Sequence, residues 1–328
     1  MALNDGPPFG PVVNGTMVIV FWEYRPSNVA AYLFLGLFAA ATLGHLIYLI
    51  WFRAWTFIPF LLGGICQIFG YLERAAAHNH PTTLGPWILQ NMLLLVSPPL
   101  LAATLYLSQH QITRALLHGT NPPTPTKRSR SCCLTCLRPT PTKTYILVDL
   151  LSIFTQLLGT ILPASGTPSA IHLSKTIILT GLALQLAALG VFMGVSCGRT
   201  HARLRRAPAR AMVADPGVNW LGYFVVMEVA AGMMVVRSVV RGVEFLEGGG
   251  GGVVRGHEVF VYVFDGVAML VVMVGFLVLY PARLVREVGR LEEREKGRGG
   301  GEGGRGALLS GGGRWEGMGR EWVGGLTA

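Results

Sequence analysis

Ionisable and amide side chains recur at helical spacing within the apolar runs of this 328-residue sequence. Asp149 and Gln156 are seven residues apart, as are Glu258 and Asp265, and seven residues make about two turns of an α-helix. The members of each pair therefore share a helix face, and Tyr262 lies between the second pair. Acids on such a face could meet a positively charged amino head group or relay a proton.

Arginines follow a similar spacing. Arg74 lies seven residues after Gln67, and Arg241 lies four residues after Arg237 and three before Glu244. Arg241 and Glu244 are therefore close enough on a helix to pair directly. Guanidinium groups of this kind could brace the acids or engage a phosphate.

Seven apolar blocks of about twenty residues must position these side chains. Hydrophobic residues make up 51% of the chain and charged residues 13%, against about 25% charged in an ordinary soluble domain. At about 1.5 Å per residue, each block can cross a hydrocarbon core of about 30 Å. This composition argues against a soluble enzyme, a disulfide-rich secreted domain and a disordered protein. We predict an all-α polytopic membrane protein with spans near Asn28–Phe52, Ala54–Leu72, Leu84–Leu107, Thr144–Ser165, Ile171–Val195, Val218–Val240 and Val259–Tyr280.

The distribution of basic residues predicts the orientation, because Lys and Arg near span ends resist translocation. With the N-terminus outside and the C-terminus cytoplasmic, 21 of the 27 Lys and Arg residues fall in cytoplasmic segments. Only four, Arg25, Arg74, Lys175 and Arg255, fall in outer segments. The one glycosylation sequon begins at Asn14, on the predicted outer side. The net charge of +10 is thus a signature of topology beside an anionic leaflet, and no nucleic-acid partner is expected.

A membrane-embedded charge costs about 2.5–3.5 kcal/mol on insertion scales, so each one needs a partner or a purpose. In this orientation Asp149, Glu228 and His45 lie deeper or toward the cytoplasm, where they could relay a proton or meet a cationic head group. Six other charged residues lie toward the outer leaflet and predict a polar vestibule that opens outward: Arg74, Arg237, Arg241, Glu244, Glu258 and Asp265. The alternative is that these groups only hold helices together through ion pairs and hydrogen bonds.

Backbone features interrupt two of the spans. Pro98 and Pro99 stand in the middle of the third span, where they should free carbonyl groups and kink the helix. Gly190, Gly194 and Gly198 repeat at intervals of four and predict close helix contact. Such features occur in transporters and receptors alike, so they do not distinguish the two classes.

Several common catalytic and cofactor motifs are missing from the sequence. No G-x-x-x-x-G-K-[ST] loop is present to bind ATP, and no H-E-x-x-H motif to bind a metal. His78 and His80 share an outer loop and could join His257 at a zinc ion, which would favour a membrane hydrolase. We nevertheless expect no enzymatic activity, no metal and no cofactor.

Composition divides the chain into an outer N-terminal segment (1–27), a seven-helix domain (28–281) and a cytoplasmic tail (282–328). A Pro-rich and basic stretch predicts a flexible cytoplasmic loop over 108–143. Within it, Cys132, Cys133 and Cys136 are candidates for acylation, or are reduced thiols without a role. The tail alternates Arg and Glu and then becomes Gly-rich, which predicts a short helix followed by disorder.

Across 24–281 the chain resembles the fungal lipid-translocating exporters, a seven-span family that includes aminocholesterol-resistance and sphingoid-base-resistance proteins. The residues that carry the resemblance are Tyr24-x-Pro26, His45, Gly70-Tyr71-x-x-Arg74, Pro86-Trp87-Ile88-x-Gln90, Pro98, Ala102-Ala103-x-x-Tyr106, Asp149 with Gln156 and Gly159, Gly181 with Gln185, Arg237-x-x-x-Arg241-x-x-Glu244 and Glu258-x-x-x-Tyr262-x-x-Asp265. The chain departs from the family at Gln67, where the family usually has Glu. Its loop before Lys143 is longer than the family's, and five glycines follow Glu247.

The resemblance implies ATP-independent movement or export of an amphipathic lipid, such as a sphingoid long-chain base or a sterol-like compound, which would give resistance to toxic lipids. Membrane lipids are then the partners, and the plasma membrane the expected location, with the vacuole or another endomembrane as the alternative. Ten residues are expected to bind or pass the substrate: Gln67, Arg74, Asp149, Gln156, Gln185, Arg237, Arg241, Glu244, Glu258 and Asp265. The rival hypothesis is a seven-span sensor or receptor that alters lipid asymmetry indirectly.

Overall fold

The computed structural model describes residues 9–13, 16–19, 26–79, 83–118, 141–162, 168–198, 200, 202, 219–247, 256–291 and 293–294. Seven stretches of helix are long and apolar enough to cross a membrane. Six of these stretches each contain one long α-helix: α1 (Asn28–Phe52), α2 (Ile58–Asn79), α3 (Leu84–His118), α4 (Pro141–Ile161), α5 (Pro168–Val191) and α8 (Trp220–Glu247). The seventh combines α10 (Glu258–Phe260), the π-helix η5 (Val261–Val267) and α11 (Ala268–Val278), and helix continues over 281–291. The predicted seven-span membrane fold is confirmed.

Shorter elements complete the described part of the chain. A 3₁₀ helix, η1 (Trp55–Phe57), joins α1 to α2, and a π-helix, η4 (Phe192–Cys197), extends α5. Two short strands, β1 (Phe9–Val13) and β2 (Thr16–Ile19), pair antiparallel, with Val12 opposite Met17. The sequence did not predict this hairpin.

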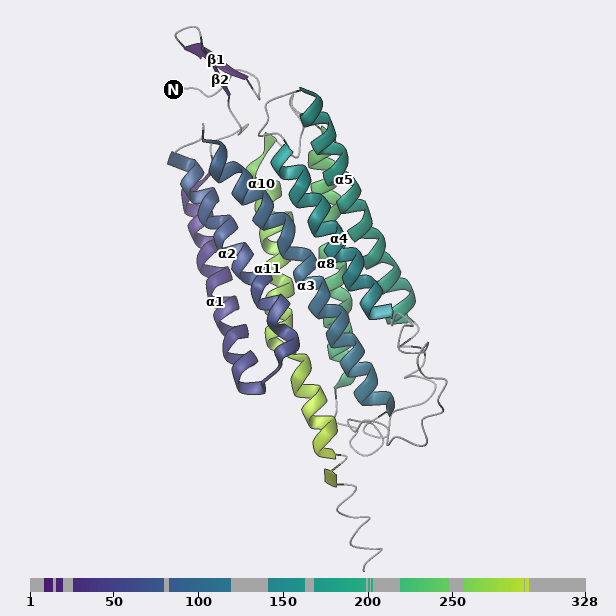
Figure 1. The fold of residues 1–328 in the computed structure, drawn as a ribbon. Coiled ribbons are helices and arrows are strands. Elements are labelled where there is room, and N and C mark those ends of the chain that lie inside the picture. Colours follow the sequence, from purple (N-terminus) through teal and green to yellow (C-terminus); the bar gives the residue numbers. More distant parts are fainter. Residues whose placement is uncertain are drawn as a thin grey trace, which may run out of the picture.

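The seven spans form a closed ring of neighbouring helices (Figure 1). Each span contacts the next along the chain, and α11 packs against both α8 and α1. Consecutive spans run antiparallel (Figure 1), so α1, α3, α5 and the seventh span begin at one end of the bundle, which we call the Ser27 end. The other spans begin at the opposite end, which we call the Trp55 end. α3 also contacts α8, and 61% of its apolar window is buried against 28% for α4, so α3 is the most enclosed span.

The first turn of the ring shows how the chain reverses at the Trp55 end. Arg53 adopts a left-handed conformation with φ 50°, and its N–H donates to the carbonyl of Ile50. The last carbonyls of a helix lack intrahelical donors. Here Nη2 of Arg286, on the helix that follows α11, donates to the carbonyls of Trp51 and Phe52 at 3.4 and 2.8 Å. The cation therefore caps α1 and ties the first span to the last.

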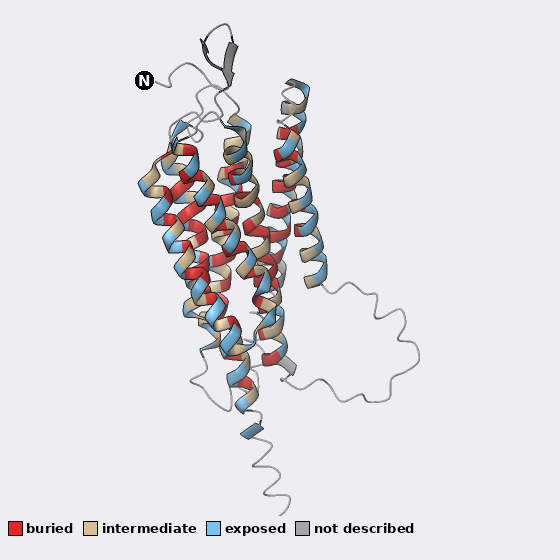
Figure 2. Cartoon of the chain, turned by 60° about the vertical axis from the view of Figure 1, so that its left-hand side comes forward, coloured by how far each residue is buried: buried red, intermediate tan, exposed pale blue. Residues whose placement is uncertain are grey.

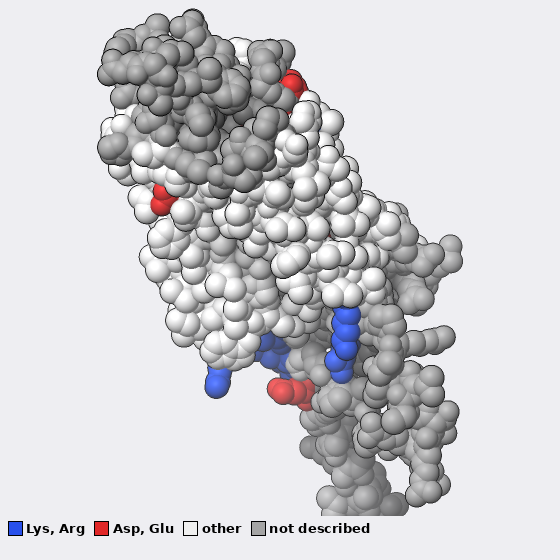
Figure 3. Space-filling view, turned by 45° about the horizontal axis from the view of Figure 1, so that its top comes forward, with Lys and Arg blue, Asp and Glu red and all other residues white. Residues whose placement is uncertain are grey.

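The outer surface of the bundle is apolar over its middle. Buried residues face inward along every span and exposed ones outward (Figure 2), and large apolar side chains such as Leu33, Ile47 and Phe154 are exposed. The visible face carries a broad belt without charge, with Lys and Arg gathered near its lower edge (Figure 3). Exposed apolar surface of this extent suits lipid and not water, as expected of an integral membrane protein.

Two expectations from the sequence need correction. The third span does not end near Leu107, because α3 continues to His118, so the loop expected from Ser108 begins only after the helix. Added Cβ atoms at Gly190, Gly194 and Gly198 would meet nothing within 4 Å. Their expected close contact with another helix is therefore wrong for the described residues. Asn14, the three loop cysteines and the Gly-rich tail lie outside the described residues.

Candidate functional site

Six of the ten candidate residues gather in the half of the bundle nearest the Ser27 end. Arg74 comes from α2, Arg237, Arg241 and Glu244 from α8, and Glu258 and Asp265 from the seventh span. A π-helix has about one extra residue per turn and occurs frequently at functional sites. In this chain η5 turns both Tyr262 and Asp265 into the core.

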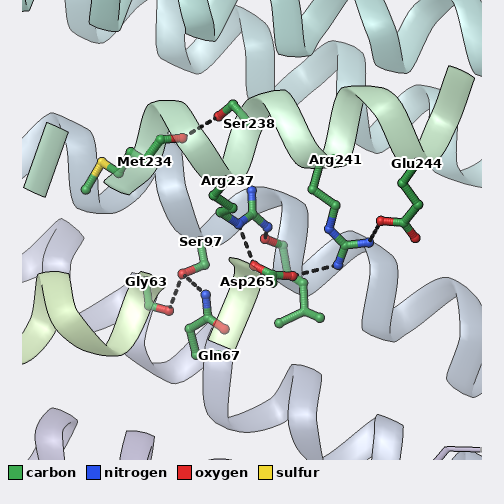
Figure 4. A network of polar contacts seen from close by, with 10 residues as sticks. Gly63, Gln67, Ser97, Met234, Arg237, Ser238, Arg241, Glu244 and Asp265 are labelled. Carbon is green, nitrogen blue, oxygen red and sulfur yellow. Dashed lines mark hydrogen bonds and ion pairs between the residues drawn. The ribbon is translucent and has the colours of Figure 1, made fainter. Parts of the chain in front are cut away.

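Asp265 is the centre of the first ion-pair group, which we call the Asp265 cluster (Arg237, Arg241, Glu244 and Asp265; Figure 4). Its Oδ1 accepts from Nε of Arg237 at 2.5 Å, and its Oδ2 accepts from Nη2 of Arg241 at 2.6 Å. Nη1 of Arg241 also donates to Oε2 of Glu244 at 2.9 Å, as the sequence predicted. Asp265 and both arginines are at most 3% exposed. One carboxylate thus binds a guanidinium group on each of two successive turns of α8, and Glu244 supplies the second negative charge.

A proline in α3 leaves free the main-chain carbonyl to which Arg237 donates. Residue 98 would normally donate its N–H to the carbonyl of Leu94, but proline has no N–H. Nη2 of Arg237 donates to that carbonyl instead. The sequence predicted that Pro98 and Pro99 would free carbonyls, and the structure identifies the partner of one of them.

Arg74 forms a second ion-pair group at the Ser27 end. Its Nη2 donates to Oε1 of Glu258 at 3.1 Å, and its Nε to the hydroxyl of Tyr262 at 3.1 Å. Its guanidinium carbon also lies 4.9 Å from the centre of the Tyr262 ring. Oε1 of Glu258 accepts from the N–H of Ser27 at 2.7 Å. This group therefore joins the start of α1, the end of α2 and the start of the seventh span.

A stack of aromatic rings connects the two ion-pair groups. Phe34 of α1 lies against Tyr71 of α2 and Tyr262, with ring centres 5.5 and 5.2 Å apart. Gly266, in η5, makes this approach possible, because an added Cβ would lie 2.6 Å from the Tyr71 hydroxyl and 2.7 Å from the Phe34 ring. The sequence analysis did not identify Phe34 as a site residue, and it named Tyr71 only as part of the family resemblance. Helical spacing could have indicated both, because Phe34 lies four residues before Phe38 and Tyr71 three residues before Arg74.

The hollow beside the Asp265 cluster is small. It offers about 10 Å³, room for about one water molecule. Its lining residues are Arg237, Val240, Arg241, Glu244, Phe260, Val261, Phe264 and Asp265. In this conformation the described residues thus leave room for no more than about one water at the place where the outward-opening polar vestibule was predicted. The charged groups do gather at one end, but they are paired with one another and hold α2, α3, α8 and the seventh span together.

Gln67 belongs to a separate hydrogen-bonded group between α2 and α3. Its Nε2 donates to Oγ of Ser97 at 3.0 Å, and that hydroxyl donates to the carbonyl of Gly63 at 2.9 Å. Gln67 and Arg74 share the buried face of α2, as predicted from their spacing. Arg74 finds its acidic partner in Glu258. A Glu at position 67 is therefore not required to pair Arg74.

The remaining three candidates lie on α4 and α5: Gln156 and Gln185 meet between these two helices, and Asp149 lies beside Tyr106 of α3. Nε2 of Gln156 donates to Oγ of Ser152 at 2.9 Å and to Oε1 of Gln185 at 3.3 Å. Ser152 in turn donates to the carbonyl of Gly181 at 2.6 Å. Asp149 is buried two turns before Gln156. The structure thus divides the ten predicted residues among three places: the two ion-pair groups, the Gln67 group, and these three residues on α4 and α5.

Two histidines named in the sequence analysis have structural partners. The Nε2 atom of His45 lies 2.9 Å from the carbonyl of Met273, and the ring is enclosed by Phe57, Phe60 and Tyr280. The Nδ1 atom of His78 lies 2.7 Å from the carbonyl of Pro26. His80 lies outside the described residues, and within the described ranges no three His, Cys, Asp or Glu side chains are placed to hold a metal ion.

Comparison with known proteins identifies the family. Residues 60–288 match the family model described as RTA1 like protein. Over 225 residues, the chain is 33% identical to protoporphyrin uptake protein 1 of Saccharomyces cerevisiae, covering 68% of this chain and 67% of that protein. It is 31% identical to protein RTM1 over 222 residues and 25% identical to protein RTA1 over 228 residues, both of Saccharomyces cerevisiae, covering 68% and 70% of this chain and 66% of each relative. No solved structure matches the chain. The chain belongs to the RTA1-like family of integral membrane proteins.

Proposed function

We propose that this protein moves an amphipathic lipid across the membrane without ATP and without catalysing a chemical reaction. The observation that carries the proposal is the Asp265 cluster, in which one buried acid holds two arginines beside a π-helical segment. Buried ion pairs contribute little net stability compared with well-packed apolar residues. The burial of Arg74, Arg237 and Arg241 in the core is therefore better explained by a function in binding than by stability alone.

The cluster could recognise a charged head group by exchanging partners. The ammonium group of a sphingoid long-chain base would compete with the arginines for Asp265 or Glu258, and a phosphate or carboxylate would compete with the acids for Arg237 or Arg241. The name of one relative adds a second substrate type and the direction of uptake, since it is called a protoporphyrin uptake protein. Both substrate types are amphiphiles with ionic groups, and a sterol-like compound is a third candidate.

The proposal includes an orientation and a location. The excess of basic residues in the predicted inner segments supports an external N-terminus. The Asp265 cluster would then face the outer leaflet of the plasma membrane, or the lumen if the protein lies in the vacuole. The partners of the protein would be membrane lipids and not nucleic acid.

Purified protein in sealed vesicles provides the test. A fluorescent sphingoid base and a porphyrin are placed in one leaflet, and their movement to the other is followed by quenching. We expect movement with the wild-type protein and a large loss with Asp265→Asn at equal amounts of folded protein. Glu228→Gln is the matched control, because Glu228 is a half-buried acid on α8 about two turns from Arg237. Full movement in Asp265→Asn would remove the cluster from the mechanism.

A second candidate function is that of a lipid sensor, which the tight packing around the Asp265 cluster favours. A hollow with room for about one water cannot pass a lipid without a rearrangement. A sensor needs only a change in ion pairing when a head group binds at the Ser27 end. In the same vesicles a sensor would bind the lipid and leave it in its leaflet.

A further inference from the structure

Asp149 of α4 is a buried acid that has no cationic partner among the residues that the structure describes. Its side chain is 2% exposed, and neither carboxyl oxygen accepts a hydrogen bond within the described chain. The hydroxyl of Tyr106, on α3, lies beside it and likewise has no partner at hydrogen-bond distance within the described residues. Asp265, equally buried, differs in holding two arginines.

Within the described residues, no compensating charge is found around Asp149. α4 packs against α3 and α5. Among the described residues, the titratable group placed beside Asp149 is Tyr106 of α3, whose ring packs against Tyr145 of α4 and against Phe192, which follows α5. The only ionisable residues of α5 are His172 and Lys175, near the opposite end of that helix.

An ionised carboxylate without a partner is strongly disfavoured in an apolar interior, so the group takes a proton and becomes neutral. A bound metal ion would also neutralise it, but hard cations need several oxygen ligands. Within the described ranges no three His, Cys, Asp or Glu side chains are placed to hold a metal ion. The surroundings therefore favour a proton over a metal ion.

A line of polar groups runs from Asp149 toward the Ser27 end. Ser152, Gln156 and Thr160 follow it at intervals of three and four along one face of α4, and all three are buried. Their hydrogen bonds leave Oε1 of Gln156 and Nε2 of Gln185 without partners. This line of polar groups therefore has one free acceptor, on Gln156, and one free donor, on Gln185, with which a water molecule or a migrating proton could bond.

We propose that Asp149 is a proton-binding site, neutral in this conformation, that exchanges its proton when the contact between α3 and α4 opens. If the protein carries a lipid as proposed above, this site couples the movement of that lipid to a proton. The coupling depends on the proposed function, whereas proton binding at Asp149 does not.

Infrared spectroscopy of the purified protein in lipid nanodiscs tests proton binding. At neutral pH exposed carboxyl groups are ionised, so a carboxylic acid C=O band reports a protonated buried acid. We expect such a band in the wild-type protein, its loss in Asp149→Asn and its retention in Glu228→Gln. The band should shift in D₂O, because a working site exchanges its proton. A spectrum without this band, or one in which Asp149 absorbs as a carboxylate at neutral pH, overturns the proposal, as does a band that never shifts.

The vesicle assay with an imposed pH gradient tests the coupling. With one proton per lipid, a difference of one pH unit can sustain up to about a tenfold concentration ratio. We expect the gradient to drive accumulation in wild-type vesicles and to have no effect in Asp149→Asn. Movement that ignores the gradient in the wild type overturns the coupling and leaves the carrier proposal intact. A failure to move any lipid argues against the carrier proposal, and the infrared result still decides proton binding.

Discussion

Nη2 of Arg237 on α8 donates a hydrogen bond to the main-chain carbonyl of Leu94 on α3. That carbonyl is available because Pro98 cannot bond to it. A proline on one helix thus creates an acceptor for an arginine on another. The same arginine is held by Asp265 of the seventh span, so three spans meet at one guanidinium group.

We predict that Pro98→Ala stabilises the protein less than Pro99→Ala. An interior proline costs a helix about 3 kcal/mol, so either substitution relieves strain. Only Pro98→Ala supplies an N–H that competes with Arg237 for Leu94, and a hydrogen bond to a charged group is worth about 1.5–3 kcal/mol. Reversible unfolding in detergent micelles would measure the two free energies. Equal stabilisation by the two substitutions would show that the Arg237–Leu94 hydrogen bond makes no net contribution to the free energy of unfolding.

We predict that Asp265→Asn destabilises the fold far more than Glu244→Gln. Removing Asp265 leaves Arg237 and Arg241 buried without their shared carboxylate, and breaking a buried pair costs about 3–5 kcal/mol. The Glu244 side chain is 21% exposed, so water can replace part of its pair with Arg241, and Arg241 keeps its pair with Asp265 when Glu244 is changed. Thermal unfolding of the two variants in the same detergent makes the comparison. Similar losses would mean that solvent already screens the Asp265 cluster.

Contacts within one helix were predictable from the sequence, and contacts between helices were not. Arg241 and Glu244 pair because they are three residues apart on α8, which the spacing alone indicates. Spacing says which residues share a face but not which helix that face meets. Asp149 and Gln156 share a face as predicted, yet they face α3 and α5 and not the Asp265 cluster.

The glycines also show that spacing within one helix does not identify a contact with another helix. Gly190, Gly194 and Gly198 have the spacing of a packing motif, but their face of the chain meets no described neighbour. Gly181 has no such repeat and lies against α4. The π-helix over Val261–Val267 was also not predictable, because no proline or glycine pattern marks its extra residue.

We predict that Gly181→Ala separates α4 from α5, whereas Gly190→Ala is tolerated. An added Cβ at Gly181 would lie 2.5 Å from Oγ1 of Thr155 and 3.2 Å from the carbonyl of Ser152, while at Gly190 it would meet nothing within 4 Å. Ala is favoured over Gly in a helix interior by about 1 kcal/mol, so Gly190→Ala should be neutral or slightly stabilising. Overpacking a tight contact costs about 1–3 kcal/mol. The unfolding midpoints of the two variants, measured side by side, should move in opposite directions. A Gly181→Ala protein as stable as the wild type would mean that the two helices are loosely packed.

We predict that the Ser27 end faces outward, and two single cysteines test this orientation in a background without the native cysteines. Thr83 lies exposed before α3 at the Ser27 end, and Arg53 lies exposed between α1 and α2 at the Trp55 end. Basic residues concentrate in the segments that join the spans at the Trp55 end, and such segments stay on the cytoplasmic side. A maleimide that cannot cross the membrane should therefore label Thr83→Cys in intact cells and Arg53→Cys only after permeabilisation. The reverse pattern would place the Asp265 cluster toward the cytoplasm, and a lipid head group would then have to enter it from the inner leaflet.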